Sequence, residues 1–249
     1  MKNIIALIPA RQGSKRIINK NIKILAGHPL LAYTIAVARQ SELFSRIIVS
    51  TESENIAKIS RYYGAEVPFL RSPRFARDDS PDIYWLKEAL TKLEVEKNNI
   101  IYFSILRPTS PFRTVEMIKK AWDKITSEES ADSLRAVELA SQHPAKMWKI
   151  VNNRLIPVIS GQTKEKIEWH SLPFQALPKV YAQNASLEIA KSEIPLKSIS
   201  ISGKNILPFI TSNYEGYDIN SKKDWIYAEY LIKTRKAKLP QINIIPFKI

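Results

Sequence analysis

The chain has 249 residues, of which 45% are hydrophobic and 25% charged, a composition typical of globular proteins rather than of disordered or fibrous ones. It contains no cysteine, which excludes disulfide bonds, a thiolate nucleophile and metal sites built on cysteine ligands. No apolar stretch approaches the roughly 20 residues that span a bilayer, and the start of the chain is too short for a secretory signal. We therefore expect a cytoplasmic protein that has no membrane partner.

The charge of the chain favours an anionic partner. Lysine and arginine number 38 against 24 aspartates and glutamates, which gives a net charge of +14, and a basic excess is typical of proteins that bind polyanions. The cations are nevertheless spread along the chain without a basic tail, and neither an aromatic RNA-binding motif nor a zinc-finger spacing is present. We interpret the excess as a solvated cationic surface and expect no nucleic-acid partner.

In the first half of the chain, apolar runs typical of strands alternate with stretches of helical periodicity. Strands are expected at residues 4–8, 46–50, 66–70 and 100–106, and helices at residues 30–39, 54–63, 82–97 and 115–125. Gly64 suits the position after the second helix, because glycine readily adopts a left-handed conformation. This alternation predicts an α/β fold in which helices cover both faces of a mostly parallel sheet, with ligands bound beyond the carboxyl ends of its strands.

The pattern changes after about residue 132. Strands are expected at residues 133–139, 147–151, 181–189 and 205–210, and a helix at residues 221–235. A turn at Asn152-Asn153 and a polar stretch without periodicity at residues 161–177 lie between them. We interpret the chain as one domain over residues 1–249 with an excursion at about residues 140–180, which serves as a dimerisation arm or a substrate lid.

The loop after the first strand is the most informative segment. Between Pro9 and Lys23 the chain carries no acid and five cations, which are Arg11, Lys15, Arg16, Lys20 and Lys23. Gly13 allows the backbone to turn with a positive φ and to bring N–H groups close to an anion. A nucleoside triphosphate supplies enough negative charge to offset the repulsion among these cations. The loop lacks a Walker ending and the three spaced glycines of dinucleotide folds, and a solvated basic turn is the alternative interpretation.

Six motifs along the chain resemble, in the same order, those of one known family. The sequence from Ile8 to Ile22 resembles the N-terminal motif of the acylneuraminate cytidylyltransferases, the synthetases of CMP-sialic acid and related CMP-nonulosonic acids. The other motifs are Ile47–Ser53, Arg71 with Phe75-Ala76-x-Asp78, Leu106–Arg113, Tyr181-x₂-Asn184, and Tyr217-Asp218-Ile219 with Asp224. The resemblance implies a Rossmann-like α/β/α fold of the nucleotide-diphospho-sugar transferase type and a homodimer. It also implies a Mg²⁺-dependent reaction in which CTP and a 2-keto nonulosonic acid give the CMP-sugar and pyrophosphate.

The resemblance also assigns a nucleotide site. Three catalytic cations hold the triphosphate and stabilise the pyrophosphate as it leaves, and these are Arg11, Lys15 and Lys20. An arginine fork suits two phosphate oxygens, whereas a lysine acts as a movable point charge. The rest of the nucleotide site comprises Gly13, Ser14, Asn21 and Arg71. Ser80 is a further candidate for a ribose or phosphate contact, although it equally suits the N-cap of the next helix, with Pro81 at the first helical position.

A metal site is expected after the strand at residues 205–210. Mg²⁺ takes oxygen ligands, usually one or two carboxylates together with phosphate oxygens and water. Asp218 is the expected carboxylate ligand. Asn220 is the expected second ligand, through its carbonyl oxygen, at a position where the family often has aspartate. Asp224 instead fits a capping box with Ser221 at the start of the last helix.

The carboxylate of the sugar acid needs a cationic partner, and the candidates are Arg107 and Arg113. Arg107 stands where the sialate enzymes usually have glutamine, whereas Arg113 has the alternative interpretation of a surface cation near the start of a helix. Gln175 and Asn184 are candidate polar contacts to the sugar. Neighbouring positions lack the arginines that sialate enzymes tend to have, which favours a modified or bacterial nonulosonic acid over N-acetylneuraminate.

Two other functions remain open. A related nucleotidyltransferase for a shorter 2-keto sugar acid or for another nucleotide would share the cationic first loop. A catalytically weak nucleotide- or polyanion-binding module would account for the net charge and for the uncharged Asn220. The three histidines show no metal-ligand spacing, and the general base of the reaction is left unassigned.

Overall fold

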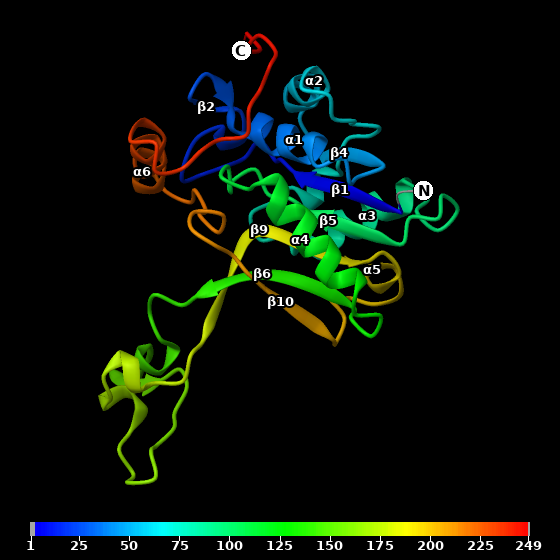
Figure 1. The fold of residues 1–249 in the computed structure, drawn as a ribbon. Helices are drawn as coiled ribbons and strands as arrows, with labels where there is room; N and C mark the ends of the chain where they lie inside the picture. The colour runs from blue at the N-terminus through cyan, green and yellow to red at the C-terminus, as the bar shows by residue number, and fades with distance from the viewer. Residues whose placement is uncertain (1–2, 249) are drawn as a thin grey trace. The chain divides into compact units, whose positions relative to one another are not determined.

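The computed structural model describes residues 3–248. Two compact units are present (Figure 1): the first comprises the residues up to Ala136 and those from Asn184 onward, and the second comprises Val137–Gln183. Strands β6 (Ser133–Leu139) and β9 (Tyr181–Lys191) carry the chain from one unit to the other. The second unit thus falls in the region where the sequence pattern changes.

The first unit is built around one sheet. In the part of the chain that the structure describes, this sheet has six strands in the order β10-β6-β9-β5-β1-β4. β1 (Ile4–Pro9) pairs in parallel with β4 (Arg46–Ser50) and with β5 (Tyr102–Ile105), whereas β9 runs antiparallel to β5. The edge strand β10 spans Ile206–Ile210. The predicted mostly parallel sheet is confirmed, with a reversal at β9 that the sequence pattern did not indicate.

Side chains alternate between the two faces of the sheet, as strand geometry requires. Ile4, Ala6 and Ile8 of β1 belong to one buried cluster. Ile5 and Leu7 of the same strand belong to another. Each fully buried side chain of this size stabilises the fold by roughly 1.5–3 kcal/mol relative to an exposed one. Because β1 is apolar on both faces, it has to lie in the interior of the sheet with a layer on either side.

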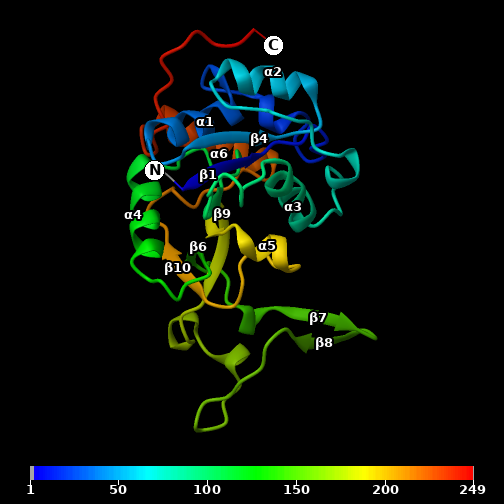
Figure 2. The ribbon, with the colours of Figure 1, turned by 90° about the vertical axis from the view of Figure 1, so that its right-hand side faces the viewer.

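Helices supply these two layers (Figure 2). The helices that pack on the cluster of Ile4 are α1 (Leu30–Gln40), α2 (Glu54–Tyr62) and α4 (Val115–Thr126). α3 (Asp82–Lys92) and the short α5 (Glu193–Lys197) pack on the other cluster. The three-layer α/β/α arrangement is therefore as predicted. Among the described residues, no helix combines the length and the apolar character needed to cross a bilayer.

Local signals set the helix boundaries. The side chains of Ser53 and Thr114 accept hydrogen bonds from backbone N–H groups in the first turns of α2 and α4. Gly64 follows α2 with a φ of 90°, as predicted. The helix predicted at residues 82–97 is too long, because the chain turns away after Lys92 and Glu94 adopts a φ of 47°.

The strand predicted at residues 66–70 is wrong. In the described residues this segment forms an isolated parallel bridge between Ile48 and Glu66. Pro68 follows two residues later, and a proline has no N–H group to donate to a neighbouring strand. A short hairpin of β2 (Ile24–Leu25) and β3 (His28–Pro29) was not predicted.

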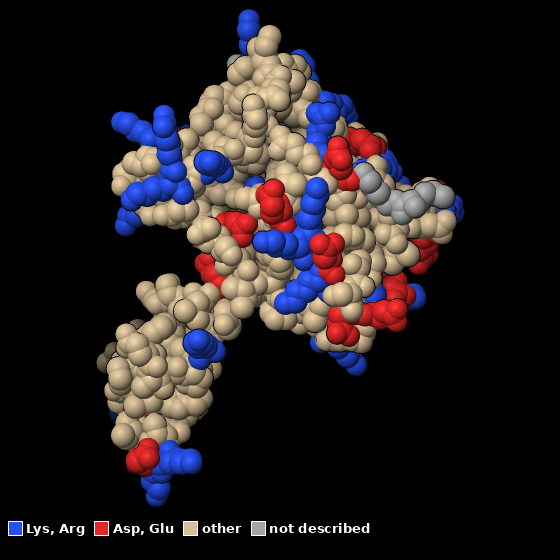
Figure 3. Space-filling model, viewed as in Figure 1, with Lys and Arg blue, Asp and Glu red and all other residues tan. Residues whose placement is uncertain are grey.

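Helix α6 (Lys222–Lys233) packs on a third buried cluster, in which its Trp225 joins Leu30 of α1. Its first turn contains the predicted capping box: the hydroxyl of Ser221 accepts from the N–H of Asp224, and the carboxylate of Asp224 accepts from the N–H of Ser221. Figure 3 shows lysines and arginines over several elements, mixed with acids over much of this face and denser over α6.

The second unit contains the hairpin of β7 (Trp148–Val151) and β8 (Arg154–Pro157) and several 3₁₀ turns. Asn152 and Asn153 make its turn with φ values of 49° and 57°, which confirms the predicted turn. Several apolar side chains of this unit are exposed, among them Ile150 at 76%. Whether the unit acts as a dimerisation arm or a substrate lid stays a prediction.

Candidate active site

The parallel strands of the first unit end at one edge of the sheet. Pro9, the last residue of β1, is paired with Ser50, the last residue of β4, and β5 runs parallel beside β1. The segment before α6 reaches the loop after β5, because the N–H of Ile219 donates to the carbonyl of Thr109 at 2.9 Å. Ligands of open α/β sheets bind at this edge, beyond the carboxyl ends of the strands.

The backbone of the loop after β1 is held by its neighbours. The N–H of Gln12 donates to Oε1 of Glu52 at 2.8 Å, and Nδ2 of the buried Asn21 donates to the carbonyl of Arg11 at 2.9 Å. The side chains that leave this backbone are accessible, with 33% of Arg11 and 81% of Lys15 exposed. A fixed backbone that carries accessible cations suits the binding of an anion.

Gly13 does not use the conformation expected from the sequence. The glycines with positive φ among the described residues are Gly27, Gly64 and Gly203. The left-handed residue of this loop is Asn19, with a φ of 52°. Within the described part of the chain, a Cβ at Gly13 would meet no atom within 4 Å. The N–H of Ser14 donates to the carbonyl of Gln12 at 2.8 Å, so Gly13 lies in a tight turn that is open on one side.

Two of the predicted catalytic cations converge on one carboxylate. Nη2 of Arg11 lies 2.5 Å from Oδ1 of Asp78, and Nζ of Lys15 lies 2.7 Å from Oδ2. Nη1 of Arg11 also donates to the carbonyl of Ala76 at 3.3 Å. The hydrogen bonds from Lys15 and Arg11 hold the pKa of Asp78 below its ordinary value. The loop that contains Asp78 thus supplies an anion that binds both cations.

Lys20 lies beside the predicted metal ligand. Its Nζ donates to the carbonyl of Ile219 at 2.7 Å. Burial lowers the pKa of Lys20, the negative charge of Asp218 opposes that shift, and Arg16 and Arg11 add to it. Because Ile219 directly follows Asp218 in the chain, the hydrogen bond to its carbonyl ties Lys20 to the segment that carries the predicted metal ligand.

Asp218 and Asn220 also contact each other. Oδ2 of Asp218 accepts a hydrogen bond from Nδ2 of Asn220 at 2.6 Å. Oδ1 of Asp218 is buried, and none of the described residues donates a hydrogen bond to it. No cluster of three acidic, histidine or cysteine side chains that could hold a metal occurs within residues 3–248. A Mg²⁺ ion could bind the unpaired carboxylate oxygen of Asp218, provided that a nucleotide and water supply most of the other ligands.

Ser80 is not the N-cap of α3. The helix begins at Asp82 with Pro81 in the capping position, so the capping interpretation is wrong. The Ser80 hydroxyl is buried, and the described residues offer it no hydrogen-bond partner. An unpaired buried hydroxyl lowers stability unless a ligand or water completes its hydrogen bonds, which is consistent with the predicted nucleotide contact.

Arg71 is buried, with 4% of the residue exposed. Its Nε donates to the hydroxyl of Ser50 at 3.0 Å and its Nη2 to the carbonyl of Ser50 at 2.8 Å, while the guanidinium lies over the ring of Trp85. Burial lowers the pKa of Arg71 to about 10. These contacts fix the start of the loop at residues 71–80 to the end of β4, and a direct contact between Arg71 and the nucleotide stays a prediction.

The alternative interpretation of Arg113 as a surface cation is wrong. Only 1% of the residue is exposed. Its guanidinium donates to three groups inside the protein, which are the carbonyl of Ser186 at 2.5 Å, the hydroxyl of Thr34 at 3.3 Å and the carbonyl of Arg107 at 3.0 Å. Burial lowers the pKa of Arg113 to about 9, against the opposing charge of Asp218. Arg113 shapes the loop after β5, and its predicted contact with a sugar carboxylate would require these bonds to break.

Arg107 is paired with acids rather than free. Its Nη2 lies 2.7 Å from Oδ2 of Asp82 and 3.2 Å from Oε1 of Glu188. Burial raises the pKa of Asp82, but the charge of Arg107 and the hydrogen bonds from Trp85 and Arg107 together outweigh this effect, so the pKa is lowered. A quarter of the Arg107 side chain is exposed, so it remains the more accessible of the two arginines predicted to bind the sugar acid.

The two polar residues predicted to contact the sugar lie in different units. Asn184, in the first unit, is buried, and its Nδ2 donates to the hydroxyl of Thr211 at 3.0 Å while its Oδ1 accepts from the hydroxyl of Ser186 at 2.6 Å. Gln175 lies in an exposed 3₁₀ turn of the second unit, Phe174–Ala176. The role of Gln175 in sugar binding stays a prediction.

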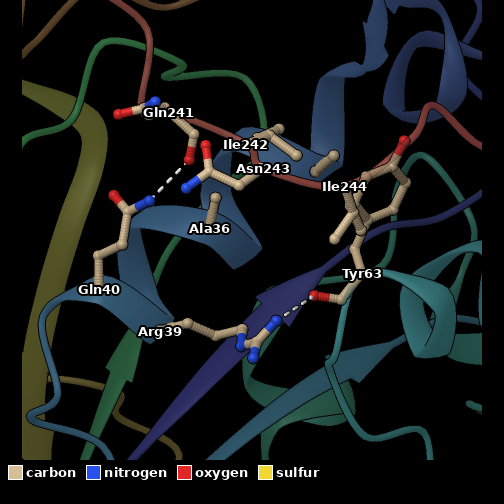
Figure 4. A pocket seen from close by; sticks show the side chains of 9 residues that line it. Ala36, Arg39, Gln40, Tyr63, Gln241, Ile242, Asn243 and Ile244 are labelled. Carbon is tan, nitrogen blue, oxygen red and sulfur yellow. Dashed lines mark hydrogen bonds between the residues drawn. The ribbon is translucent and has the colours of Figure 1, made fainter.

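A cavity of about 390 Å³ lies apart from these residues (Figure 4). It is lined by α1, by Tyr63 and by the C-terminal segment at residues 241–244. Nε2 of Gln40 donates to the carbonyl of Gln241 at 2.6 Å, which ties this segment to α1. None of the residues predicted for the active site lines the cavity.

Sequence reasoning about single residues missed Glu52 and Asp78. Glu52 anchors the loop after β1 through Gln12, and Asp78 binds its cations. Both residues lie within motifs that were identified in the sequence analysis. Their pairing with the loop after β1 could not be predicted, because it depends on how segments distant in the sequence come together in the fold.

Comparison with known proteins identifies the family. Residues 5–184 match the family model described as "Cytidylyltransferase", which is well over half of the chain. The chain belongs to the cytidylyltransferase family. Five of the six motifs lie within this match, which confirms the resemblance to the cytidylyltransferases and the expected class of enzyme, a nucleotidyltransferase.

Relatives of this cytidylyltransferase align with more than nine tenths of its chain. It is 34% identical to "Post-translational flagellin modification protein B" of Campylobacter coli, over 96% of this chain and 98% of that protein. It is 33% identical to "CMP-N,N'-diacetyllegionaminic acid synthase" of Legionella pneumophila, over 95% of this chain and 99% of that protein. The structure of "CMP:2-keto-3-deoxy-manno-octonic acid synthetase" in complex with CTP has a TM-score of 0.65 at 14% identity, over 93% and 99% of the two chains. The fold is therefore that of a nucleotidyltransferase.

Proposed function

We propose that this chain transfers CMP from CTP to a 2-keto nonulosonic acid and releases pyrophosphate. Membership of the cytidylyltransferase family and the name of the 33% identical relative support this proposal. The observation that carries it is the grouping, at the carboxyl edge of the sheet, of accessible cations with an unpaired carboxylate oxygen of Asp218.

The proposed reaction is an in-line displacement at the α-phosphorus. A bond forms between a hydroxyl oxygen of the sugar acid and this phosphorus, the bond between the phosphorus and the pyrophosphate oxygen breaks, and the hydroxyl proton is released to water. Arg11 and Lys15 are proposed to hold the leaving phosphates, where they stabilise the negative charge that grows on the pyrophosphate. Lys20 is proposed to hold the phosphate nearest Asp218, since its ammonium donates to the carbonyl of Ile219, the residue that follows Asp218.

Mg²⁺ is the proposed cofactor. Oδ1 of Asp218 and the side-chain carbonyl of Asn220 would hold it, and the unpaired, buried state of that carboxylate oxygen supports this assignment. When bound, the ion supplies positive charge to phosphate oxygens. Asp218 and Asn220 would hold the ion, and the cations of the loop after β1 would neutralise the remaining negative charge of the triphosphate.

We also propose that the enzyme is a homodimer formed through the second unit. Ile150 and Leu155 are directly opposite each other in the hairpin, and 76% and 62% of these residues are exposed. Apolar side chains that share one exposed face of a hairpin are typical of protein–protein contacts. The substitutions Ile150→Glu and Leu155→Glu together should convert a dimer into a monomer in light scattering, and an unchanged mass would contradict this part of the proposal.

Pyrophosphate release tests the proposed activity. The enzyme is incubated with CTP, Mg²⁺ and one acid from a panel that includes legionaminic, pseudaminic and N-acetylneuraminic acids and a 3-deoxy-octulosonic acid. We expect release with a nonulosonic acid to exceed release with the eight-carbon acid. Preference for the eight-carbon acid would favour the related nucleotidyltransferase, and tight binding of RNA at physiological salt without any release would favour the polyanion-binding module.

A further inference from the structure

Asp78 binds two phosphate-site cations at once. Its Oδ1 lies 2.5 Å from Nη2 of Arg11, and its Oδ2 lies 2.7 Å from Nζ of Lys15. Each carboxylate oxygen therefore pairs with one of the two cations that the proposed function assigns to the triphosphate. Two oxygens on one anionic centre are also what a phosphate group presents to an arginine and a lysine.

The start of the loop that carries Asp78 is fixed by contacts other than these ion pairs. At its start, Arg71 binds Ser50 through its guanidinium. The next residue, Ser72, donates to the carboxylate of Glu88 through both its N–H and its hydroxyl. The start of the segment that carries Asp78 is thus anchored away from the loop after β1, and nearer to Asp78 the segment is also held by Arg11, which donates to the carbonyl of Ala76 at 3.3 Å.

The ion pairs of Asp78 add little to the stability of the fold. About a third of the side chains of Asp78 and Arg11 and most of Lys15 are exposed, and exposed pairs contribute little because water and salt screen them. Their effect is therefore expected on ligand binding, because a polyanion competes with Asp78 for the same two side chains.

We propose that Asp78 is a positioning residue that acts as an internal counter-anion for the polyphosphate site. In the nucleotide-free enzyme it holds Arg11 and Lys15 at the mouth of the loop after β1. A triphosphate, with several negative charges, displaces it from both cations. After the reaction Asp78 competes with the pyrophosphate product for them and so favours its release. This inference rests on the proposed function.

The substitution Asp78→Asn tests the proposal, and Asp79→Asn is its matched control. Asp79 is the next residue, it is 72% exposed in its side chain, and it pairs with Arg77 rather than with the loop after β1. Both variants raise the net charge by one unit, so a general attraction for anions changes equally in the two. Affinity for inorganic pyrophosphate and for CTP is measured by isothermal titration calorimetry without Mg²⁺, at one fixed ionic strength.

We expect Asp78→Asn to bind pyrophosphate roughly 2- to 30-fold more tightly than Asp79→Asn, which corresponds to the release of two exposed ion pairs. In the Arg11→Ala background this gain should shrink, because one of the two competing pairs is already absent. The product inhibition constant of pyrophosphate should fall by a similar factor, with an unchanged melting temperature.

Equal or weaker pyrophosphate binding by Asp78→Asn, relative to Asp79→Asn, would overturn the inference. The proposed function would survive that result, provided that the wild-type enzyme binds CTP and that Arg11→Ala weakens this binding. A wild-type enzyme that binds neither CTP nor pyrophosphate, with Mg²⁺ present as well as without it, would overturn the proposed function, and the inference with it.

Discussion

The loops after β1 and β5 meet at the same edge of the sheet and both carry cations, but they use them differently. In the loop after β1, Arg11 and Lys15 are accessible and pair with Asp78, a carboxylate from another loop. In the loop after β5, Arg113 is 1% exposed and donates to three groups inside the protein. The first pair of cations can exchange its partner for a ligand, whereas Arg113 cannot do so without leaving buried acceptors unpaired.

This difference shows that the accessibility and the exchangeable partner of a cation, rather than its residue type, indicate a ligand-binding role. Removing a buried, hydrogen-bonded cation orphans the groups around it and lowers stability. Removing an accessible cation from a phosphate site lowers binding and turnover instead. Substitution of Arg113 should therefore lower the stability of the fold, whereas substitution of Arg11 should lower the activity.

The largest expected effect is the loss of stability in Arg113→Met. Methionine fills much of the volume, but it leaves the carbonyls of Ser186 and Arg107 without their donor, and each buried unpaired group costs about 1–3 kcal/mol. Urea unfolding should show a decrease of roughly 3 kcal/mol in the free energy of unfolding. Arg11→Met is the control, with a change within about 1 kcal/mol. Wild-type stability in Arg113→Met, together with a large rise in the KM of the sugar acid, would reverse the assignment.

Arg11→Ala should lower turnover by at least ~10²-fold, because it removes charge stabilisation that grows as the pyrophosphate leaves. Its thermal melting should match that of the wild type, since the side chain is partly exposed and its backbone carbonyl is still held by Asn21. Steady-state pyrophosphate release measures the first quantity and calorimetry the second. Near-normal kinetics would show that this loop does not bind the triphosphate.

The substitution Asp218→Asn tests whether Asp218 is a ligand of the proposed Mg²⁺ ion. The variant keeps the shape of the side chain but loses the negative charge at the unpaired oxygen. Turnover should fall by roughly 10- to 100-fold, and the Mg²⁺ concentration for half-maximal rate should rise, because a neutral ligand binds Mg²⁺ more weakly. A lower melting temperature with an unchanged Mg²⁺ requirement would instead make Asp218 a structural residue.

Asp224→Ala should have the smallest effect, a stability decrease of about 1 kcal/mol from the lost helix cap. Burial raises the pKa of Asp224, but the hydrogen bonds from the backbone of Asn220 and from Ser221 outweigh it, so the pKa lies below its ordinary value of 3.8. A depressed carboxyl pKa contributes stability above the unfolded pKa and loses it as pH falls through the folded pKa. The stability difference between wild type and variant should therefore be full at neutral pH and vanish in acid.

Much of the fold was predictable because it depends on local patterns. The alternation of apolar runs gave β1, β4 and the helices that follow them, and the Ser221–Asp224 spacing gave the capping box. The strand predicted at residues 66–70 failed because apolar character there competes with Pro68, which cannot donate to a neighbouring strand. Local pattern indicates where elements form, whereas pairing needs a free donor at each position.

The sequence predicted which residues belong to the candidate site better than it predicted how they are buried and paired. Motifs identified Arg11, Lys15 and Asp218, and the structure brings these side chains to one edge of the sheet. The burial of Arg113 and the pairing of Arg107 with acids could not be predicted, because each depends on residues more than 70 positions away in the chain, such as Ser186 and Glu188. Sequence spacing carries no information about which distant carbonyl or carboxylate will face an arginine.

A crystal structure with CTP and Mg²⁺ tests the central claim most directly. We expect Arg11, Lys15 and Lys20 to contact the phosphates, Asp78 to have given up both cations, and Arg113 to keep its bonds inside the protein. A nucleotide bound elsewhere, with Arg11 and Lys15 still paired to Asp78, would contradict the account.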